Sequence, residues 1–227
     1  KQGEWVKAKL TFSEGNQHPG VTAEILQVYG PELPSTADIG MVSAEFNLVE
    51  EHSPEAIRQA ESYKLDPEEE VRKGRVDLRK LPLITIDGET ARDFDDAVFV
   101  ERLNGGFVLW VGIADVSHYV NEDSPLDMDA YARGTSVYFP ERAFHMLPRA
   151  LSENLCSLVP KQPRLCMVSR IELDVTGKRT RVEVMEAVMD SHRRATYNEI
   201  QAEWDQNRDN ATWEFRPHFE LYQILRK

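Results

Sequence analysis

The sequence has few cysteines and no long apolar run, and both shortages narrow the class of protein. Its two cysteines, Cys156 and Cys166, lie in the apolar contexts NLCSL and RLCMV. Because secreted disulfide scaffolds are rich in cysteine, we expect two reduced core thiols and a cytoplasmic protein. No apolar run approaches the roughly 18 residues of a membrane helix, so no membrane partner is expected. The chain begins KQGEWVKAKL, without a methionine or a secretory signal, which indicates a piece of a longer protein.

Basic residues are also outnumbered. The chain holds 27 Lys and Arg against 39 Asp and Glu, a formal net charge of −12. Most proteins that hold nucleic acid through phosphate contacts alone are basic, so the composition argues mildly against such a partner. A metal-dependent nuclease escapes that argument when cations and local basic patches anchor the RNA. The segment RKGRVDLRK, Arg72 to Lys80, is either such a patch or a solvated linker.

What the chain does contain is the pattern of an α+β protein with mostly antiparallel strands and flanking helices. Residues 4–13, 20–30 and 40–48 read as strands of a partial small β-barrel, which we place at 1–50. Residues 51–80 form a linker, in which Ser53-Pro54 and Asp66-Pro67 open short helices.

The character of the chain changes at residue 81. LPLITID predicts a strand, and Asn104 to Gly106 (NGG) between two apolar runs predicts a hairpin. A capped helix ending at Gly134, a short strand at SVYFP, a second hairpin around VTGK and a helix after Thr196 follow. We assign 81–227 to one domain.

An acidic cluster stands directly behind the predicted strand LPLITI. The stretch TIDGETARDFDDAV, residues 85–98, contains Asp87, Asp93, Asp95 and Asp96. Neighbouring carboxylates repel unless a cation lies among them. A calcium-binding EF-hand is excluded, because DGETARDFDDAV lacks glycine at its sixth position and glutamate at its twelfth.

Magnesium fits the cluster better, since it takes one or two carboxylates per ion and keeps sites for water and substrate phosphate. Two such ions roughly 3.5–4 Å apart hold both oxygens of a phosphodiester in line. From the residues alone, a hydrolytic metal site and a solvated acidic turn both remain open.

The stretch GRVDLRKLPLITIDGETARDFDDAV resembles the start of the catalytic (RNB) domain of the ribonuclease II superfamily, and within it the ribonuclease R family. The resemblance continues through LWVGIADVSHYV, LDMDAYARGTSVYFP, HMLPRALSENLCSL and RLCMV, so it covers about 74–170 strongly and the rest more weakly. Several separate motifs in one order make it specific. It implies a processive, monomeric exoribonuclease that hydrolyses single-stranded RNA from its 3′ end with Mg²⁺ or Mn²⁺, releasing nucleoside 5′-monophosphates.

The resemblance also assigns residues. The family's four catalytic aspartates fall on Asp87, Asp93, Asp95 and Asp96, which it makes the catalytic and metal-binding set. Asp95 matches the aspartate nearest the chemistry, bound to a metal or positioning the attacking water. The tyrosine that stacks on the 3′-terminal base falls on Tyr138, and a second RNA-binding tyrosine falls on Tyr197. We decline His118 as a general base, because a packed histidine is the commoner case.

Two departures limit what the resemblance implies. Residues 4–49 resemble only the last part of the family's cold-shock, OB-type barrel, which binds single strands in a groove with stacking platforms. The family's catalytic domain continues past position 227, where it supplies a basic and an acidic residue to the same centre. We therefore expect a fragment that is inactive alone. The competing hypothesis is a non-catalytic RNA- or protein-binding module derived from the enzyme.

Overall fold

The structure, a computed structural model, describes residues 3–13, 20–32, 37–103 and 105–227. The chain divides into two compact units. The first comprises Lys1–Glu51 and Ser136–Phe144, and the second His52–Thr135 and His145–Lys227. In the described ranges, no helix is long and apolar enough to cross a membrane.

In its described residues, the first unit holds two small antiparallel sheets and one helix. Strand β1 (Trp5–Ser13) pairs with β2 (Gly20–Gly30), which confirms the strands predicted at 4–13 and 20–30. The short strands β7 (Val137–Tyr138) and β8 (Ala143–Phe144) form the second sheet and confirm the strand predicted at SVYFP.

The third barrel strand, predicted at 40–48, is wrong. Residues 40–45 instead belong to helix α1 (Ala37–Glu45). Alanine, methionine and glutamate favour a helix, and the Ser43 hydroxyl donates to the Ile39 carbonyl one turn back, at 2.6 Å. A short apolar run does not distinguish a strand from a buried helix by its spacing alone, and here Ala37 and Ile39 become the buried face.

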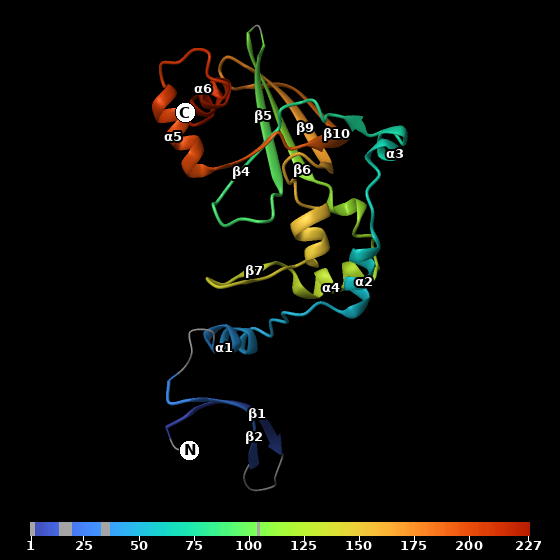
Figure 1. Ribbon diagram of the computed structural model, residues 1–227, viewed down its shortest axis with the longest axis vertical. Coiled ribbons are helices and arrows are strands. Elements are labelled where there is room, and N and C mark those ends of the chain that lie inside the picture. The colour runs from blue at the N-terminus through green and yellow to red at the C-terminus, as the bar shows by residue number, and fades with distance from the viewer. Residues whose placement is uncertain (1–2, 14–19, 33–36, 104) are drawn as a thin grey trace. The chain divides into compact units, whose positions relative to one another are not determined.

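The second unit is built on a seven-stranded sheet with the order β11-β4-β5-β6-β9-β10-β3 (Figure 1). Its strands are β3 (Val76–Asp77), β4 (Ile84–Asp87), β5 (Asp96–Leu103), β6 (Gly106–Ala114), β9 (Pro163–Asp174), β10 (Arg179–Asp190) and β11 (Arg193–Thr196). The outermost pairs, β11 with β4 and β10 with β3, are parallel, and the others are antiparallel. The predicted α+β class with a mostly antiparallel sheet is confirmed.

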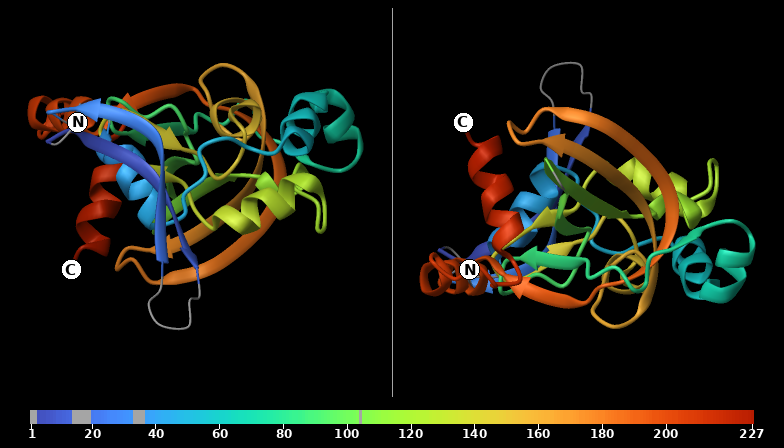
Figure 2. Two further views of the ribbon diagram at one scale, coloured as in Figure 1. Left: turned by 90° about the horizontal axis from the view of Figure 1, so that it is seen from below. Right: turned by 90° about the horizontal axis from the view of Figure 1, so that it is seen from above.

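Both predicted hairpins are present, as β5–β6 and β9–β10. The long strands β9 and β10 curve strongly, as both views of Figure 2 show. Gly106 opens β6 beside the Leu173 carbonyl of β9, where an added Cβ would lie 1.9 Å from that oxygen. Glycine is therefore required by this close approach, and the NGG signal marks it in the sequence.

Five α-helices flank this sheet in the described part of the second unit. They are α2 (Pro54–Ser62), α3 (Pro67–Arg72), α4 (Pro125–Arg133), α5 (Tyr197–Asn207) and α6 (Arg216–Leu225). The predicted caps Ser53, Asp66, Ser124 and Thr196 accept hydrogen bonds from backbone N–H groups of the first turns. Gly134 ends α4 with a φ of +73°, a left-handed conformation that glycine adopts readily.

Buried side chains form three groups around the sheet. One joins α2 and α4 to the sheet through Tyr119, Leu126 and Leu151. A second, which includes Leu83, Phe94, Leu158 and Cys166, lies where β4 and β5 meet, and a third lies under α6. Cys156 and Cys166 are buried and free, as predicted, and burial raises the pKa of each thiol to about 12. Both are therefore core thiols rather than reactive ones.

Candidate active site

The four aspartates lie at one end of the sheet, around the connection from β4 to β5. Asp87 is the last residue of β4, and Asp96 is the first residue of β5. Asp93 and Asp95 belong to the connecting segment, residues 88–95, which we call the acidic loop. Sequence neighbours thus become spatial neighbours because the chain leaves the sheet after Asp87 and re-enters it at Asp96.

The fold positions these residues by burying the residues next to them in the chain. Leu83, Ile84 and Thr85 are buried, so β4 is fixed in the core up to the aspartate that ends it. Phe94 turns its ring into the core, while its neighbours Asp93 and Asp95 are half-buried and exposed. The Asp95 carbonyl accepts a hydrogen bond from the Ala114 N–H at 2.9 Å, which joins the end of the loop to β6.

Electrostatics show that the carboxylates influence one another. Burial raises the pKa of Asp87, the charge of Asp96 raises it further, and nearby Arg194 partly opposes both. Burial also raises the pKa of Asp95, followed by the charges of Asp93 and Asp96. The Asp95 side chain is nevertheless exposed to solvent. Burial is the first cause of both shifts, and the neighbouring like charges add to it.

The ligand type of the four aspartates, though not their placement, suits a hard divalent cation. All four side chains offer carboxylate oxygens, the ligands that Mg²⁺ prefers. Asp87 Oδ2 is buried and has no hydrogen-bond partner in the described structure, so it is an unsatisfied acceptor. Among the described residues, however, no group of three or more His, Cys, Asp or Glu side chains could hold a metal ion. Metal binding by all four aspartates stays a prediction.

Tyr197 lies beside the cluster. Thr196, the last residue of β11, is in register with Asp87 of β4, and Tyr197 follows it as the first residue of α5. Its side chain is 64% exposed, as a platform for a ligand requires. Tyr138 belongs to the first unit, on β7, and is likewise 65% exposed. The RNA-binding role of either tyrosine stays a prediction.

The His118 side chain contacts neighbouring residues of the fold. Its Nδ1 lies 3.3 Å from Arg75 Nη2, and its ring packs edge-on against Tyr119. Arg75 is buried and donates to Asp115 at 2.7 Å and to Glu70 at 3.2 Å. This network joins α3 to the end of β6, so His118 has the structural surroundings that we preferred over a catalytic role.

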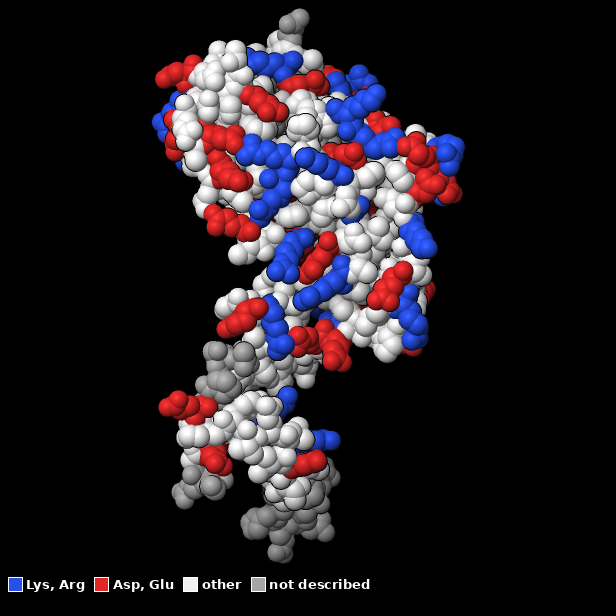
Figure 3. Space-filling model, viewed as in Figure 1, with Lys and Arg blue, Asp and Glu red and all other residues white. Residues whose placement is uncertain are grey.

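The basic segment 72–80 is also largely paired internally. Besides Arg75, Lys73 forms ion pairs with Glu69 and Glu70, and Arg79 pairs with Glu68 and Asp77. On the face shown in Figure 3, basic and acidic side chains are interspersed over the second unit. The segment therefore serves mainly to attach α3 to its neighbours rather than to present a continuous basic patch.

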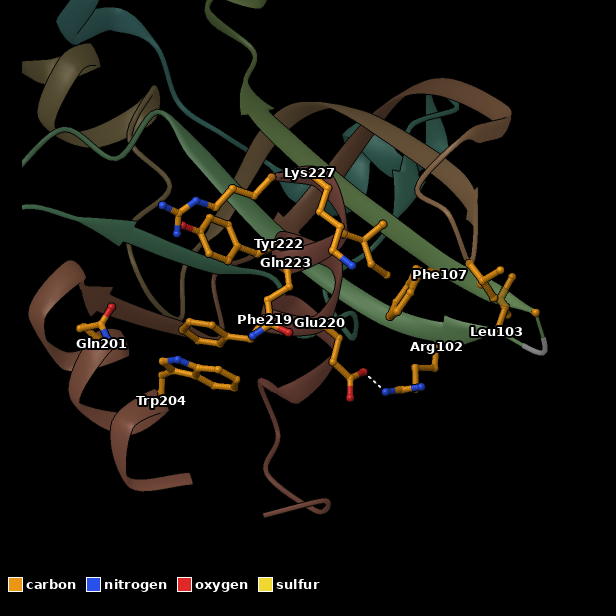
Figure 4. A pocket seen from close by; sticks show the side chains of 15 residues that line it. Arg102, Leu103, Phe107, Gln201, Trp204, Phe219, Glu220, Tyr222, Gln223 and Lys227 are labelled. Carbon is orange, nitrogen blue, oxygen red and sulfur yellow. Dashed lines mark ion pairs between the residues drawn. The ribbon is translucent and has the colours of Figure 1, made fainter. Parts of the chain in front are cut away.

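A separate hollow of about 980 Å³ lies between the β5–β6 hairpin and the helices α5 and α6 (Figure 4). Trp204 and Phe219 line it and stack face to face, with ring centroids 4.3 Å apart. Arg102 and Glu220 form an ion pair at its edge. The residues that line it include none of the four aspartates, so this hollow is not the predicted site.

The comparisons with known proteins agree with the sequence motifs. A family model described as the RNB domain matches residues 75–227, two thirds of the chain. Ribonuclease R of Vibrio cholerae is 40% identical over 233 aligned positions, covering 100% of this chain and 28% of that protein. Ribonuclease R of Escherichia coli K12 is 47% identical over 181 positions, covering 78% of this chain and 22% of that protein.

A solved structure, Mycoplasma genitalium RNase R in complex with double-stranded RNA, has the same fold. Its TM-score is 0.84 at 29% identity, and the match covers 96% of this chain and 40% of that one. The chain therefore belongs to the RNB domain family. It spans less than a third of the length of the curated relatives described above.

Sequence reasoning missed the residues that support the acidic loop. Ser157 and Arg194 hydrogen-bond to its backbone from segments 63 and more than 100 positions away. Neither carries a spacing signal, because the contacts exist only once the sheet has formed.

Proposed function

We propose that the whole protein is a hydrolytic exoribonuclease that removes nucleotides from RNA 3′ ends and releases nucleoside 5′-monophosphates. The observation that carries this proposal is the set of four mutually repelling carboxylates at the end of β4 and the start of β5, in a chain of the RNB domain family. The names of its relatives, ribonuclease R, support the same activity.

In this proposal Asp87, Asp93 and Asp96 hold Mg²⁺ or Mn²⁺, and Asp95 binds a metal or positions the attacking water. The ion, when bound, supplies Lewis-acid stabilisation of the charge that develops on the phosphodiester oxygens. The protein's own contribution is to place the four carboxylates around the connection from β4 to β5. Arg194 assists, because its positive charge opposes the rise in the pKa of Asp87.

The exposed tyrosines are assigned to the RNA. An aromatic ring grips any base through its π-face, which suits an enzyme that must advance along every sequence. Tyr138 is proposed to stack on the 3′-terminal base, and Tyr197, next to the strand end that carries Asp87, to contact the terminal nucleotide. The proposed substrate is thus single-stranded RNA with a free 3′ end.

The test uses the whole protein and a single-stranded RNA labelled at its 5′ end. We expect the label to remain on progressively shorter products while 5′-monophosphates accumulate. A requirement for inorganic phosphate, with release of nucleoside diphosphates, would contradict the hydrolytic mechanism. Binding of the RNA with no shortening at any Mg²⁺ or Mn²⁺ concentration would favour the alternative of a non-catalytic RNA-binding module.

A further inference from the structure

The acidic loop is joined to the core through Phe94, the residue between Asp93 and Asp95. Its ring is 8% exposed and packs in the same buried group as Leu158. The Arg194 guanidinium lies over the ring, 5.6 Å from its centroid. The side chain between two of the predicted catalytic carboxylates is therefore buried in the core, with the Arg194 guanidinium over its ring.

The backbone of Phe94 is held as well, by the segment that follows the π-helical turn Leu151–Leu155. Its N–H donates to Ser157 Oγ at 2.9 Å, and its carbonyl accepts from the Leu158 N–H at 2.8 Å. The same Ser157 hydroxyl donates to the Arg92 carbonyl at 3.3 Å. One hydroxyl thus bridges the two peptide groups that lie on either side of Asp93.

Ser157 is itself fixed. Its side chain is fully buried, and its carbonyl accepts from Arg164 Nε at 3.0 Å. Arg164, 5% exposed, also donates to the carbonyl of Asn154 at 2.9 Å and to its side-chain oxygen at 2.8 Å. The residue that bridges the loop is therefore itself held by hydrogen bonds inside the second unit.

The far side of the acidic loop has a second attachment. Arg194 Nη2 donates to the carbonyls of Gly88 and Glu89, both at 2.9 Å. Asn198 Nδ2 donates to Glu89 Oε1 at 2.8 Å. The loop is thus tied at its start by β11 and α5, and at its end by Ser157.

We propose that Ser157 is a positioning residue, whose bridging hydroxyl fixes the placement of Asp93 and Asp95 before any ion or RNA arrives. This inference rests on the proposed function. Like charges on a flexible loop move apart, so a metal that needs them together would have to overcome that spread. Hydrogen bonds from Ser157 to the loop backbone hold the carboxylates in place before a metal binds. Residues that hydrogen-bond to metal ligands orient those ligands in the same way.

The test is Ser157→Ala in the whole protein, with Ser152→Ala as the matched control. Ser152 belongs to the adjacent π-helical turn, and its Oγ is buried without a hydrogen-bond partner in the described structure. Each change removes one buried hydroxyl, but only the first breaks a bridge to the acidic loop. The probes are Mn²⁺ alone, titrated by its paramagnetic resonance signal, and amide hydrogen exchange of residues 88–95 without metal.

We expect Ser157→Ala to weaken Mn²⁺ binding by about 10–100-fold, the usual effect of removing a group that orients metal ligands. Amide exchange in the acidic loop should become faster, and the hydrolysis rate should fall. Ser157→Thr, which keeps the hydroxyl, should restore Mn²⁺ affinity, loop exchange and hydrolysis. Ser152→Ala should match wild type in each measurement. If Ser157→Ala and Ser152→Ala are indistinguishable in Mn²⁺ affinity and in loop exchange, the inference is overturned.

Two further results keep this inference separate from the proposed function. If Ser157→Ala does not fold, amide exchange of Phe94 in the wild-type protein provides the test. Strong protection of this amide supports its hydrogen bond to Ser157, and exchange as fast as that of the exposed Thr90 refutes it. If Asp95→Asn leaves hydrolysis intact, the proposed function fails, while the exchange comparison still measures whether Ser157 holds the loop.

Discussion

Acid should destabilise the second unit through His218, a histidine of α6 that the fold keeps neutral. Its Nε2 accepts a hydrogen bond from the Val100 N–H at 3.1 Å, and its Nδ1 is buried without a partner in the described structure. The rings of Phe99 and Phe215 pack edge-on against it. Burial lowers the pKa of His218 to about 4.

The size and sign of the effect follow from proton linkage. The unfolded chain binds the proton near pH 6.5, whereas the folded chain resists it until about pH 4. Stability is therefore complete above pH 6.5 and is lost as the pH falls from 6.5 toward 4. The full loss is about 3 kcal/mol, of which about 2 kcal/mol falls between pH 7.5 and pH 5.0.

The assay is urea denaturation of the wild type and of His218→Gln at pH 7.5 and 5.0. The glutamine carbonyl accepts the Val100 N–H but binds no proton, so groups that titrate elsewhere cancel in the comparison. We expect the free energy of unfolding of the wild type to fall by about 2 kcal/mol more than that of the variant. Equal losses in the two proteins would refute the buried, neutral histidine. Because α6 packs against β5, which begins at Asp96, acid should also loosen the strand that carries part of the candidate site.

The remaining predictions concern the metal and the RNA. Mn²⁺ should bind weakly, because phosphate oxygens complete its coordination, and binding measured by calorimetry should disappear in the double variant Asp87→Asn/Asp96→Asn; equal binding by that variant would remove the assignment. Tyr138→Ala in the whole protein should weaken binding of a short RNA by about 5–150-fold, the equivalent of one lost stacking contact, with less effect on bond cleavage. Tyr131→Ala, which removes a tyrosine that is 88% exposed on α4, is its control. Loss of chemistry with unchanged affinity would show that Tyr138 has another role.

Most elements of the second unit could be predicted because their signals are local. Ser53-Pro54, Asp66-Pro67 and Thr196 with Glu199 cap helices through bonds that reach only two or three residues along the chain. The β5–β6 hairpin has its turn signal and its alternating apolar residues in the sequence itself. The positions of Asp87 and Asp96 follow directly, since each ends or begins a strand.

The features that could not be predicted depend on contacts between segments far apart in the chain. The predicted strand at 40–48 is the helix α1, because the apolar pattern there allowed either form. Arg75 appeared as part of a basic patch, but it is buried against Asp115, 40 positions away. Ser157 lies 63 positions from the amide that it accepts from. Contacts between residues so far apart in the chain leave no local pattern in the sequence, so they could not be predicted from it.

The central claim is tested most directly at Asp95, by comparing Asp95→Asn with Glu89→Gln in the whole protein. Both variants remove one negative charge from the acidic loop, but glutamine at 89 retains the oxygen that accepts from Asn198. We expect Asp95→Asn to abolish hydrolysis of single-stranded RNA while its RNA affinity stays equal or rises slightly, because RNA phosphates meet less negative charge. Glu89→Gln should remain active. Activity of Asp95→Asn close to that of wild type would contradict the account, and so would a loss of RNA binding in parallel with the loss of rate.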